Sequence, residues 1–264
     1  MRVALCQMTA SDEPQDNLAQ VRETVRRAAG EGARLAVFPE AAMVRFGGPL
    51  APVAEPLDGP WADGVRAVAE ETGVTVVAGM FTPASGGRVA NTLLATGPGV
   101  EDSYDKIHLY DAFGFRESDT VAAGERVVTV QVDGVGVGLA TCYDLRFPEL
   151  FRAHADAGAE LTVLPASWGA GPGKVDQWDL LVRARAVDAA LWVAAVGQAP
   201  PDPEADLRQP TKAPTGVGRS TLVAPDGTVR ARLGSAPQLL VQDVDVSEAA
   251  RVRRAVAVLD NRRL

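Results

Sequence analysis

Cys142 is the residue whose type and setting indicate chemistry most directly. It stands in GLATCYDLRFPEL, residues 138–150, where an apolar strand ends at the cysteine and a helix begins within about five residues. Such a strand-turn-helix elbow lifts a nucleophile clear of a sheet and leaves backbone N–H groups near the helix start available to an oxyanion. The alternative is a buried cysteine that packs as a small hydrophobe, and Cys6, in an N-terminal strand without polar neighbours, fits that structural role.

A catalytic thiol needs a base or a cation beside it, because an ordinary cysteine is only a few per cent thiolate at pH 7. The two histidines, His108 and His154, would allow a Cys/His hydrolase, although neither lies in a motif that would orient it. Lys106, in EDSYDKIHLYD, is the other candidate partner. It is one of three lysines among 26 cations, which favours a place where a compact ammonium fits and a guanidinium does not. A solvated surface lysine is the alternative.

A carboxylate at the end of a buried strand is a third candidate. In LAVFPEAAM, the apolar run at residues 35–38 is followed by a proline and then by Glu40. Open α/β sheets build their sites at the carboxyl ends of strands, which is where this carboxylate would lie. The alternative for Glu40 is an acid in the first turn of a helix.

In the order FPE, YDKIHLYD and TCYDLRFPE, these segments resemble the nitrilase superfamily, the carbon-nitrogen hydrolases with a Glu-Lys-Cys triad. The resemblance extends over nearly the whole chain and implies that Glu40 is the general base, Lys106 the cation on the oxyanion side and Cys142 the nucleophile. It also implies that Glu117, in RESD, is a second glutamate beside the lysine; a surface acid is the alternative. KIHLYD and RESD resemble most closely the branch that contains deaminated glutathione amidase and ω-amidase.

The implied reaction is hydrolysis of the C–N bond of a small linear carboxamide through a cysteine thioester, with release of ammonia. Glu40 would take the thiol proton, protonate the leaving nitrogen and later activate water. Nitrile cleavage and N-carbamoyl hydrolysis would use the same three residues and remain alternatives. A catalytically idle relative that serves as a scaffold or binding module is an alternative of another class.

Three residues near the elbow are candidates for substrate binding. Arg146 lies one helical turn beyond Cys142, and the resemblance implies that its planar fork anchors a substrate carboxylate. The alternative is a structural salt bridge with Glu149 or another nearby acid. The backbone N–H of Tyr143 would donate to the oxyanion, and Trp168 would either line the pocket or serve in packing.

The elements that must position these residues alternate between strand and helix, which predicts an α/β layered domain with a mixed sheet. Helical spacing of apolar residues predicts helices near 18–28 and 61–69 and over 174–190. Asp226-Gly227, between Leu222-Val223 and Val229, predicts a hairpin. The strands are predicted at residues 3–8, 35–38, 74–80, 127–132, 135–142, 161–164, 192–196 and 239–246. We expect one domain over 1–264; the resemblance implies a four-layer α-β-β-α sandwich and a homodimer or higher homo-oligomer.

Composition excludes several other classes. The 264 residues carry a formal charge of −8, which argues against nucleic acid and against an anionic membrane surface as partners. The first apolar run is shorter than a signal segment and no run reaches the length of a membrane span, so we expect a cytoplasmic protein with two reduced cysteines. Metal motifs and phosphate-binding glycine motifs are absent from the sequence, so we expect no metal and no cofactor; the expected partner is a small-molecule amide.

Overall fold

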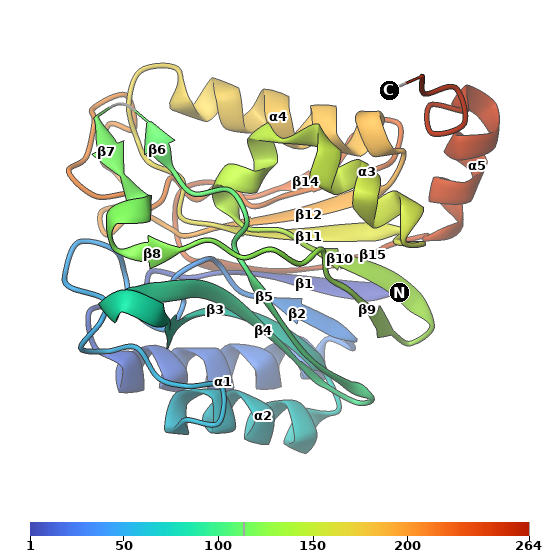
Figure 1. The fold of residues 1–264 in the computed structure, drawn as a ribbon. Helices are drawn as coiled ribbons and strands as arrows, with labels where there is room; N and C mark the ends of the chain where they lie inside the picture. Colours follow the sequence, from blue (N-terminus) through green and yellow to red (C-terminus); the bar gives the residue numbers. More distant parts are fainter. Residues whose placement is uncertain (113, 264) are drawn as a thin grey trace.

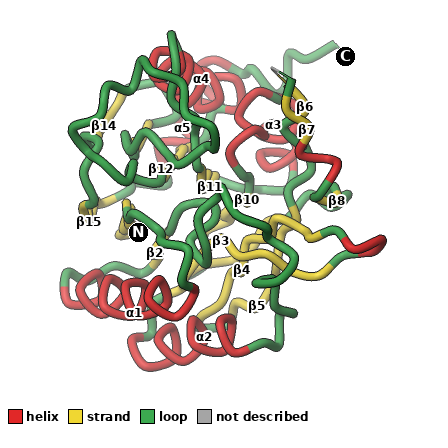
Figure 2. Tube along the Cα trace, turned by 90° about the vertical axis from the view of Figure 1, so that its left-hand side faces the viewer, coloured by secondary structure: helices red, strands yellow, loops and turns green. Residues whose placement is uncertain are grey.

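Two β-sheets packed face to face form the centre of the computed structural model, which describes residues 1–112 and 114–263 (Figure 1). Helices α1 and α2 cover the outer face of one sheet, and α3 and α4 cover the outer face of the other; the view turned by 90° shows the same layers (Figure 2). The α-helices are α1 (Pro14–Gly30), α2 (Pro60–Thr72), α3 (Pro148–Asp156), α4 (Lys174–Ala189) and α5 (Ser247–Val256). The predicted α-β-β-α sandwich is confirmed.

The first sheet has seven strands in the order β15-β1-β2-β3-β4-β5, and β8 pairs with β4. Strands β1, β2 and β3 are parallel, whereas β15, β4 and β5 pair antiparallel with their neighbours. The sheet is therefore mixed, as predicted. Its strands are β1 (Arg2–Gln7), β2 (Leu35–Val37), β3 (Thr75–Pro83), β4 (Val89–Gly97), β5 (Val100–Asp105), β8 (Val121–Ala122) and β15 (Gln238–Asp243).

The second sheet has six strands in the order β14-β13-β12-β11-β10-β9, again with three parallel strands, β10, β11 and β12, at its centre. Its strands are β9 (Thr129–Val132), β10 (Val135–Leu139), β11 (Leu161–Ala166), β12 (Trp192–Gly197), β13 (Thr221–Val223) and β14 (Val229–Arg232). Each sheet thus has a β-α-β-α-β centre. The carboxyl ends of parallel strands meet at one edge of a sheet, which is where α/β proteins place their sites.

Local sequence accounts for these elements. Helix α1 buries a stripe that includes Leu18, Val21 and Val25, and a proline begins both α1 and α2, where the missing N–H costs nothing. Gly64 lets the two helices pack closely, because a Cβ there would lie 2.5 Å from a methyl carbon of Leu18. One apolar core fills the space between the sheets and under α3 and α4, and a second lies between the first sheet and α1 and α2.

The structure corrects several predicted boundaries and adds elements that were not predicted, among them α5. The strand predicted to run to Cys142 ends at Leu139, because the next two residues leave the sheet to enter the elbow. The strand predicted to run to residue 246 ends at Asp243, just before α5. Strands β4 and β5 were not predicted, since VANTLLATG and VEDSYD mix polar residues into both faces.

The predicted hairpin at Asp226-Gly227 is confirmed between β13 and β14. Gly227 has a φ of 83°, and the Asp226 carboxylate accepts a hydrogen bond from Thr228 N–H at 2.9 Å. Within the residues that the structure describes, none of the helices is both long and apolar enough to cross a membrane.

Candidate active site

The chain brings Glu40 to the site in the turn that follows β2. Gly79, in β3, donates its N–H to the carbonyl of Pro39 at 3.3 Å, and a Cβ at Gly79 would lie 2.7–2.9 Å from three backbone atoms of this turn. Beyond the end of β12, the Gln198 side chain donates to the carbonyls of Glu40 and Ala41, at 3.2 and 3.1 Å. Both sheets therefore hold the backbone of Glu40 in place.

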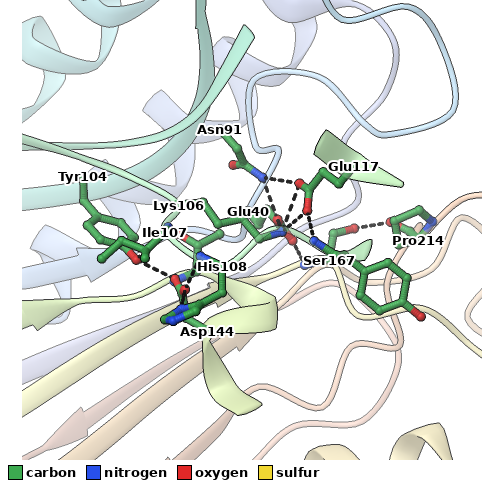
Figure 3. A network of polar contacts seen from close by, with 12 residues as sticks. Glu40, Asn91, Tyr104, Lys106, Ile107, His108, Glu117, Asp144, Ser167 and Pro214 are labelled. Atoms are coloured by element: carbon green, nitrogen blue, oxygen red, sulfur yellow. Dashed lines mark hydrogen bonds and ion pairs between the residues drawn. The ribbon is translucent and has the colours of Figure 1, made fainter. Parts of the chain in front are cut away.

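The carboxylate of Glu40 is buried and accepts three hydrogen bonds (Figure 3). The donors are the Asn91 amide at 2.8 Å, the Lys106 ammonium at 3.1 Å and the backbone N–H of Ser167 at 2.7 Å. These donors come from β4, from the segment after β5 and from the residue that follows β11. They fix the orientation of the carboxylate from three sides.

Lys106 follows β5 directly and is 2% exposed. Its ammonium lies between two carboxylates, 3.1 Å from Glu40 and 2.9 and 3.0 Å from the two oxygens of Glu117. Burial by itself lowers the pKa of Lys106, but the charges of Glu40 and Glu117 outweigh burial and raise this pKa above its ordinary value. The lysine is therefore an ammonium across the physiological pH range.

Glu117 begins the 3₁₀-helix η2 (Glu117–Asp119) and is 5% exposed, so the surface-acid alternative is wrong. Besides its two contacts with Lys106, one of its oxygens accepts the N–H of Tyr110 at 2.6 Å. The second glutamate is thus anchored by its own loop while it holds the ammonium.

Cys142 begins the 3₁₀-helix η3 (Cys142–Arg146), which leads into α3. Its φ of 45° is a strained value for a residue with a side chain and gives the sharp turn of the predicted elbow. The residue keeps partial exposure, unlike the fully buried Cys6. Burial and the charge of Glu40 raise the pKa of the Cys142 thiol, while the ammonium of Lys106 opposes them. The three predicted residues therefore form one group, in which the Glu40 carboxylate lies beside the Cys142 thiol.

Asp144 ties the cysteine segment to the lysine segment and was missed from the sequence. It is completely buried and accepts the Tyr104 hydroxyl at 2.6 Å, the His108 backbone N–H at 3.1 Å and the Thr141 N–H at 2.8 Å (Figure 3). The His108 ring lies 2.7 Å from the same carboxylate. Tyr104 and His108 lie on either side of Lys106 in the chain. Because both bond to the Asp144 carboxylate, this carboxylate holds the segments of Lys106 and Cys142 together.

The candidate binding residues lie around the elbow. The Arg146 guanidinium is 5.7 Å from the Tyr143 ring centre and 5.1 Å from that of Trp168, within cation–π range, and it donates to the Gln177 side chain at 2.8 Å. No carboxylate of the described residues is within salt-bridge distance of Arg146, so the predicted alternative of a salt bridge with Glu149 is wrong. Trp168 is 4% exposed; its ring packs against Trp178 and also faces the Arg146 guanidinium.

The Cys/His alternative is not favoured by the geometry. His154 is completely buried on α3 with its ring 3.1 Å from the Thr162 hydroxyl, and the ring of His108 is engaged by Asp144 and stacks on Phe147. The charges that act most strongly on Cys142 belong instead to Glu40 and Lys106.

Asn91 and Ser167 also contribute to the site and were missed. Asn91 bridges toward both glutamates, at 2.8 Å from Glu40 and 3.5 Å from Glu117. The one available signal was the asparagine inside the apolar run VANTLLA, but β4 itself was not recognised. Ser167 acts through its backbone N–H, which no sequence pattern reveals. In the described parts of the chain, no group of three or more acidic, histidine or cysteine side chains is arranged to hold a metal ion.

The two packed sheets with their outer helices and the buried Glu-Lys-Glu group beside a cysteine define the class, a nitrilase-like α-β-β-α sandwich. The sequence model of the carbon-nitrogen hydrolase family matches residues 2–254. The chain therefore belongs to the carbon-nitrogen hydrolase family, and its relatives include amidases.

Among curated proteins, the chain is 54% identical to a hydrolase of Mycobacterium tuberculosis over 266 residues, covering 99% of this chain and 95% of that protein. It is 33% identical to the deaminated glutathione amidase of Escherichia coli O157:H7, covering 100% and 97%. Among solved structures, a CN-hydrolase superfamily protein from Xanthomonas campestris has a TM-score of 0.84 at 27% identity, covering 100% of this chain and 98% of that one.

An amidase from Nesterenkonia sp. AN1 also matches, with a TM-score of 0.79 and 27% identity over 97% of this chain and 94% of that one. That structure is of a mutant with the acetamide moiety of fluoroacetamide added covalently at the active-site cysteine. The predicted family is confirmed, and so is the amidase character of its named relatives.

Proposed function

We propose that the protein hydrolyses small linear carboxamides to a carboxylic acid and ammonia through a thioester on Cys142. The observation that carries this proposal is the convergence of Cys142, Lys106 and Glu40 from three distant segments, with the lysine held between Glu40 and Glu117. A thiol on a partly exposed residue, a buried carboxylate and a fixed ammonium are the nucleophile, base and oxyanion donor that amide hydrolysis requires.

In the first half-reaction, Glu40 takes the thiol proton while the sulfur of Cys142 bonds to the amide carbon. The carbonyl oxygen becomes an oxyanion beside Lys106 and the backbone N–H of Tyr143, which makes no backbone hydrogen bond within the described residues. The C–N bond then breaks as Glu40 returns the proton to nitrogen, and ammonia leaves. In the second half-reaction, Glu40 removes a proton from water and the resulting hydroxide attacks the thioester carbon. The C–S bond then breaks, the carboxylic acid leaves, and Glu40 returns its proton to the sulfur to restore the thiol.

Arg146 supports an acidic substrate. Its guanidinium lies one turn beyond the nucleophile without a carboxylate partner in the described chain, and a planar fork suits a substrate carboxylate. Relatives that carry activity names include the deaminated glutathione amidase and, at 32% identity over 99% of this chain and 95% of that protein, the mouse omega-amidase NIT2. We therefore propose an amide whose acyl part bears a carboxylate.

The test is ammonia release from α-ketoglutaramate, deaminated glutathione, a carbamoyl compound and a nitrile, with mass spectrometry of the protein. We expect the first two to be hydrolysed and an acyl adduct to form on Cys142. Cys142→Ala should reduce turnover at least about 10⁴-fold, because both half-reactions pass through the sulfur. Cys6→Ala is the matched control and should remain active.

A fully active Cys142→Ala protein would refute nucleophilic catalysis. Preference for the nitrile or the carbamoyl compound would replace the amidase proposal with one of its alternatives, and failure on every compound would support a non-catalytic relative.

The contribution of Arg146 has a separate test. Arg146→Met should raise KM about tenfold or more for an acidic amide and much less for a neutral one, because a charge-assisted pair of hydrogen bonds is lost. Arg26→Met removes an exposed guanidinium from α1 and serves as the control. An equal effect of Arg146→Met on KM for both amides would contradict the role of Arg146 as the anchor of the substrate carboxylate.

A further inference from the structure

Lys174 is a second cation near the elbow that the proposed function does not use. It is the first residue of α4 and follows a glycine-rich loop, residues 169–173, in which Gly173 has a φ of 67°. The indole N–H of Trp168 donates to the carbonyl of Lys174 at 2.9 Å, and Gly171 N–H donates to the carbonyl of Leu207 at 2.9 Å. The backbone under this lysine is therefore fixed by its own loop and by a neighbouring one.

The side chain of Lys174 extends toward aromatic residues of the site. Its ammonium lies 3.3 Å from the hydroxyl of Tyr110 and 5.7 Å from the centre of that ring. The Tyr110 ring in turn meets the ring of Tyr143 edge to face, with centres 5.0 Å apart. Tyr143 is the residue next to the nucleophile, so one aromatic pair leads from Lys174 to Cys142.

Arg146 lies against the same aromatic group, near the rings of Tyr143 and Trp168. Partial burial and the positive charge of Arg146 lower the pKa of Lys174, while negative charge on Cys142 raises it. The charges of Arg146 and Cys142 thus both act on Lys174. Two like charges that interact from partly buried side chains repel each other, and an anion bound between them relieves that repulsion.

We propose that Lys174, with the hydroxyl of Tyr110, is a specificity-determining contact for the same substrate carboxylate that Arg146 binds. Each oxygen of the carboxylate would face one cation, which selects the monoamide of a dicarboxylic acid over a neutral amide of the same length. This inference rests on the proposed function and names its substrate class. Lys174 contributes to binding of the acyl part of the substrate. The bonds that form and break are handled by Cys142, Lys106 and Glu40.

The experiment compares Lys174→Met with Lys212→Met, which removes the charge of an exposed lysine in a surface loop. The substrates are glutaramate and valeramide, two five-carbon amides that differ in the terminal carboxylate. For Lys174→Met, we expect the ratio of kcat/KM for glutaramate to kcat/KM for valeramide to fall about tenfold or more, mainly through KM for glutaramate. Lys174→Arg should restore part of the ratio, and Lys212→Met should leave it unchanged.

Calorimetric binding of glutarate provides a readout that needs no turnover, and we expect its Kd to rise about tenfold or more in Lys174→Met. Equal ratios and equal glutarate affinities in Lys174→Met and Lys212→Met would overturn the role of Lys174 while leaving the proposed hydrolysis intact. If the wild-type protein hydrolyses neither amide, the proposed function fails, and the glutarate titration still decides whether Lys174 binds the carboxylate.

Discussion

At the scale of single residues, the site depends on one ammonium buried between two carboxylates. An isolated buried lysine loses its proton, but here Glu40 and Glu117 raise the pKa of Lys106 although burial lowers it. The charges of both glutamates act on the Cys142 thiol, and of the two it is Glu40 that also makes a side-chain hydrogen bond with it. In the reaction that we propose, the two glutamates have different roles: Glu40 exchanges protons, while Glu117 positions the lysine and keeps it charged.

Glu117→Gln tests this division. The amide keeps the shape but removes one negative charge, so the pKa of Lys106 should fall and the alkaline limb of the kcat/KM profile should move to lower pH. We expect kcat to drop about 10²–10³-fold at neutral pH, the size of effect seen when an oxyanion donor is lost. Glu23→Gln, on the exposed side of α1, is the control. An unshifted alkaline limb would contradict the role given to Glu117.

At the scale of elements, the site forms where strands of both sheets end. The turn after β2 carries Glu40, the elbow after β10 carries Cys142, and the residue after β11 supplies the N–H of Ser167. The backbone at these ends is crowded, because Gly79 of β3 lies directly against the turn of Glu40. The position of Glu40 is therefore set by backbone packing as well as by the hydrogen bonds of its carboxylate.

Gly79→Ala should displace that turn. The new Cβ would approach Ala41 N, Pro39 O and Glu40 Cα at 2.7, 2.8 and 2.9 Å, and backbone atoms cannot rotate away as a side chain can. We expect a loss of about 1–3 kcal/mol of unfolding free energy, measured by urea denaturation, and a fall in kcat. Gly30→Ala meets no atom within 4 Å and is the matched control. Wild-type turnover in Gly79→Ala would show that the turn does not position Glu40.

At the scale of the whole molecule, the packing of the layers determines how stability depends on pH. His154, between α3 and the second sheet, has its pKa lowered to about 4 by burial, although the charge of Asp144 opposes this. A side chain that is neutral in the folded protein and charged in the unfolded chain favours unfolding in acid. The contribution of the neutral His154 side chain to the free energy of unfolding is fully present above about pH 6.5, the pKa of histidine in the unfolded chain, and is lost as the pH falls toward 4.

His154→Leu isolates this contribution. Between pH 7 and pH 4, the wild-type protein should lose up to about 3 kcal/mol more unfolding free energy than the variant, since the unfolded histidine takes up a proton that the folded one refuses. Urea denaturation of both proteins at several pH values gives the difference directly. Parallel curves for the two proteins would mean that His154 is not the group responsible.

The sequence by itself determined the residue types and the local elements. The glutamates, the lysine and the cysteine stand in short motifs, and apolar periodicity places β2, β10 and α4, because these patterns depend only on near neighbours in the chain. It could not predict β4 and β5, whose polar residues obscure the strand pattern and whose pairing is set by partners in the sheet.

Only the tertiary structure decided which groups meet. Asp144 holds the segments of Lys106 and Cys142 together, Asn91 reaches both glutamates, and Arg146 faces aromatic rings in place of Glu149. Such contacts join residues tens of positions apart, and they exist because the two sheets pack with the ends of their parallel strands side by side. Packing of this kind leaves no periodic pattern in the chain. The residues in recognisable motifs, Glu40, Lys106 and Cys142, were therefore predicted, whereas Asp144, Asn91 and Ser167 were missed.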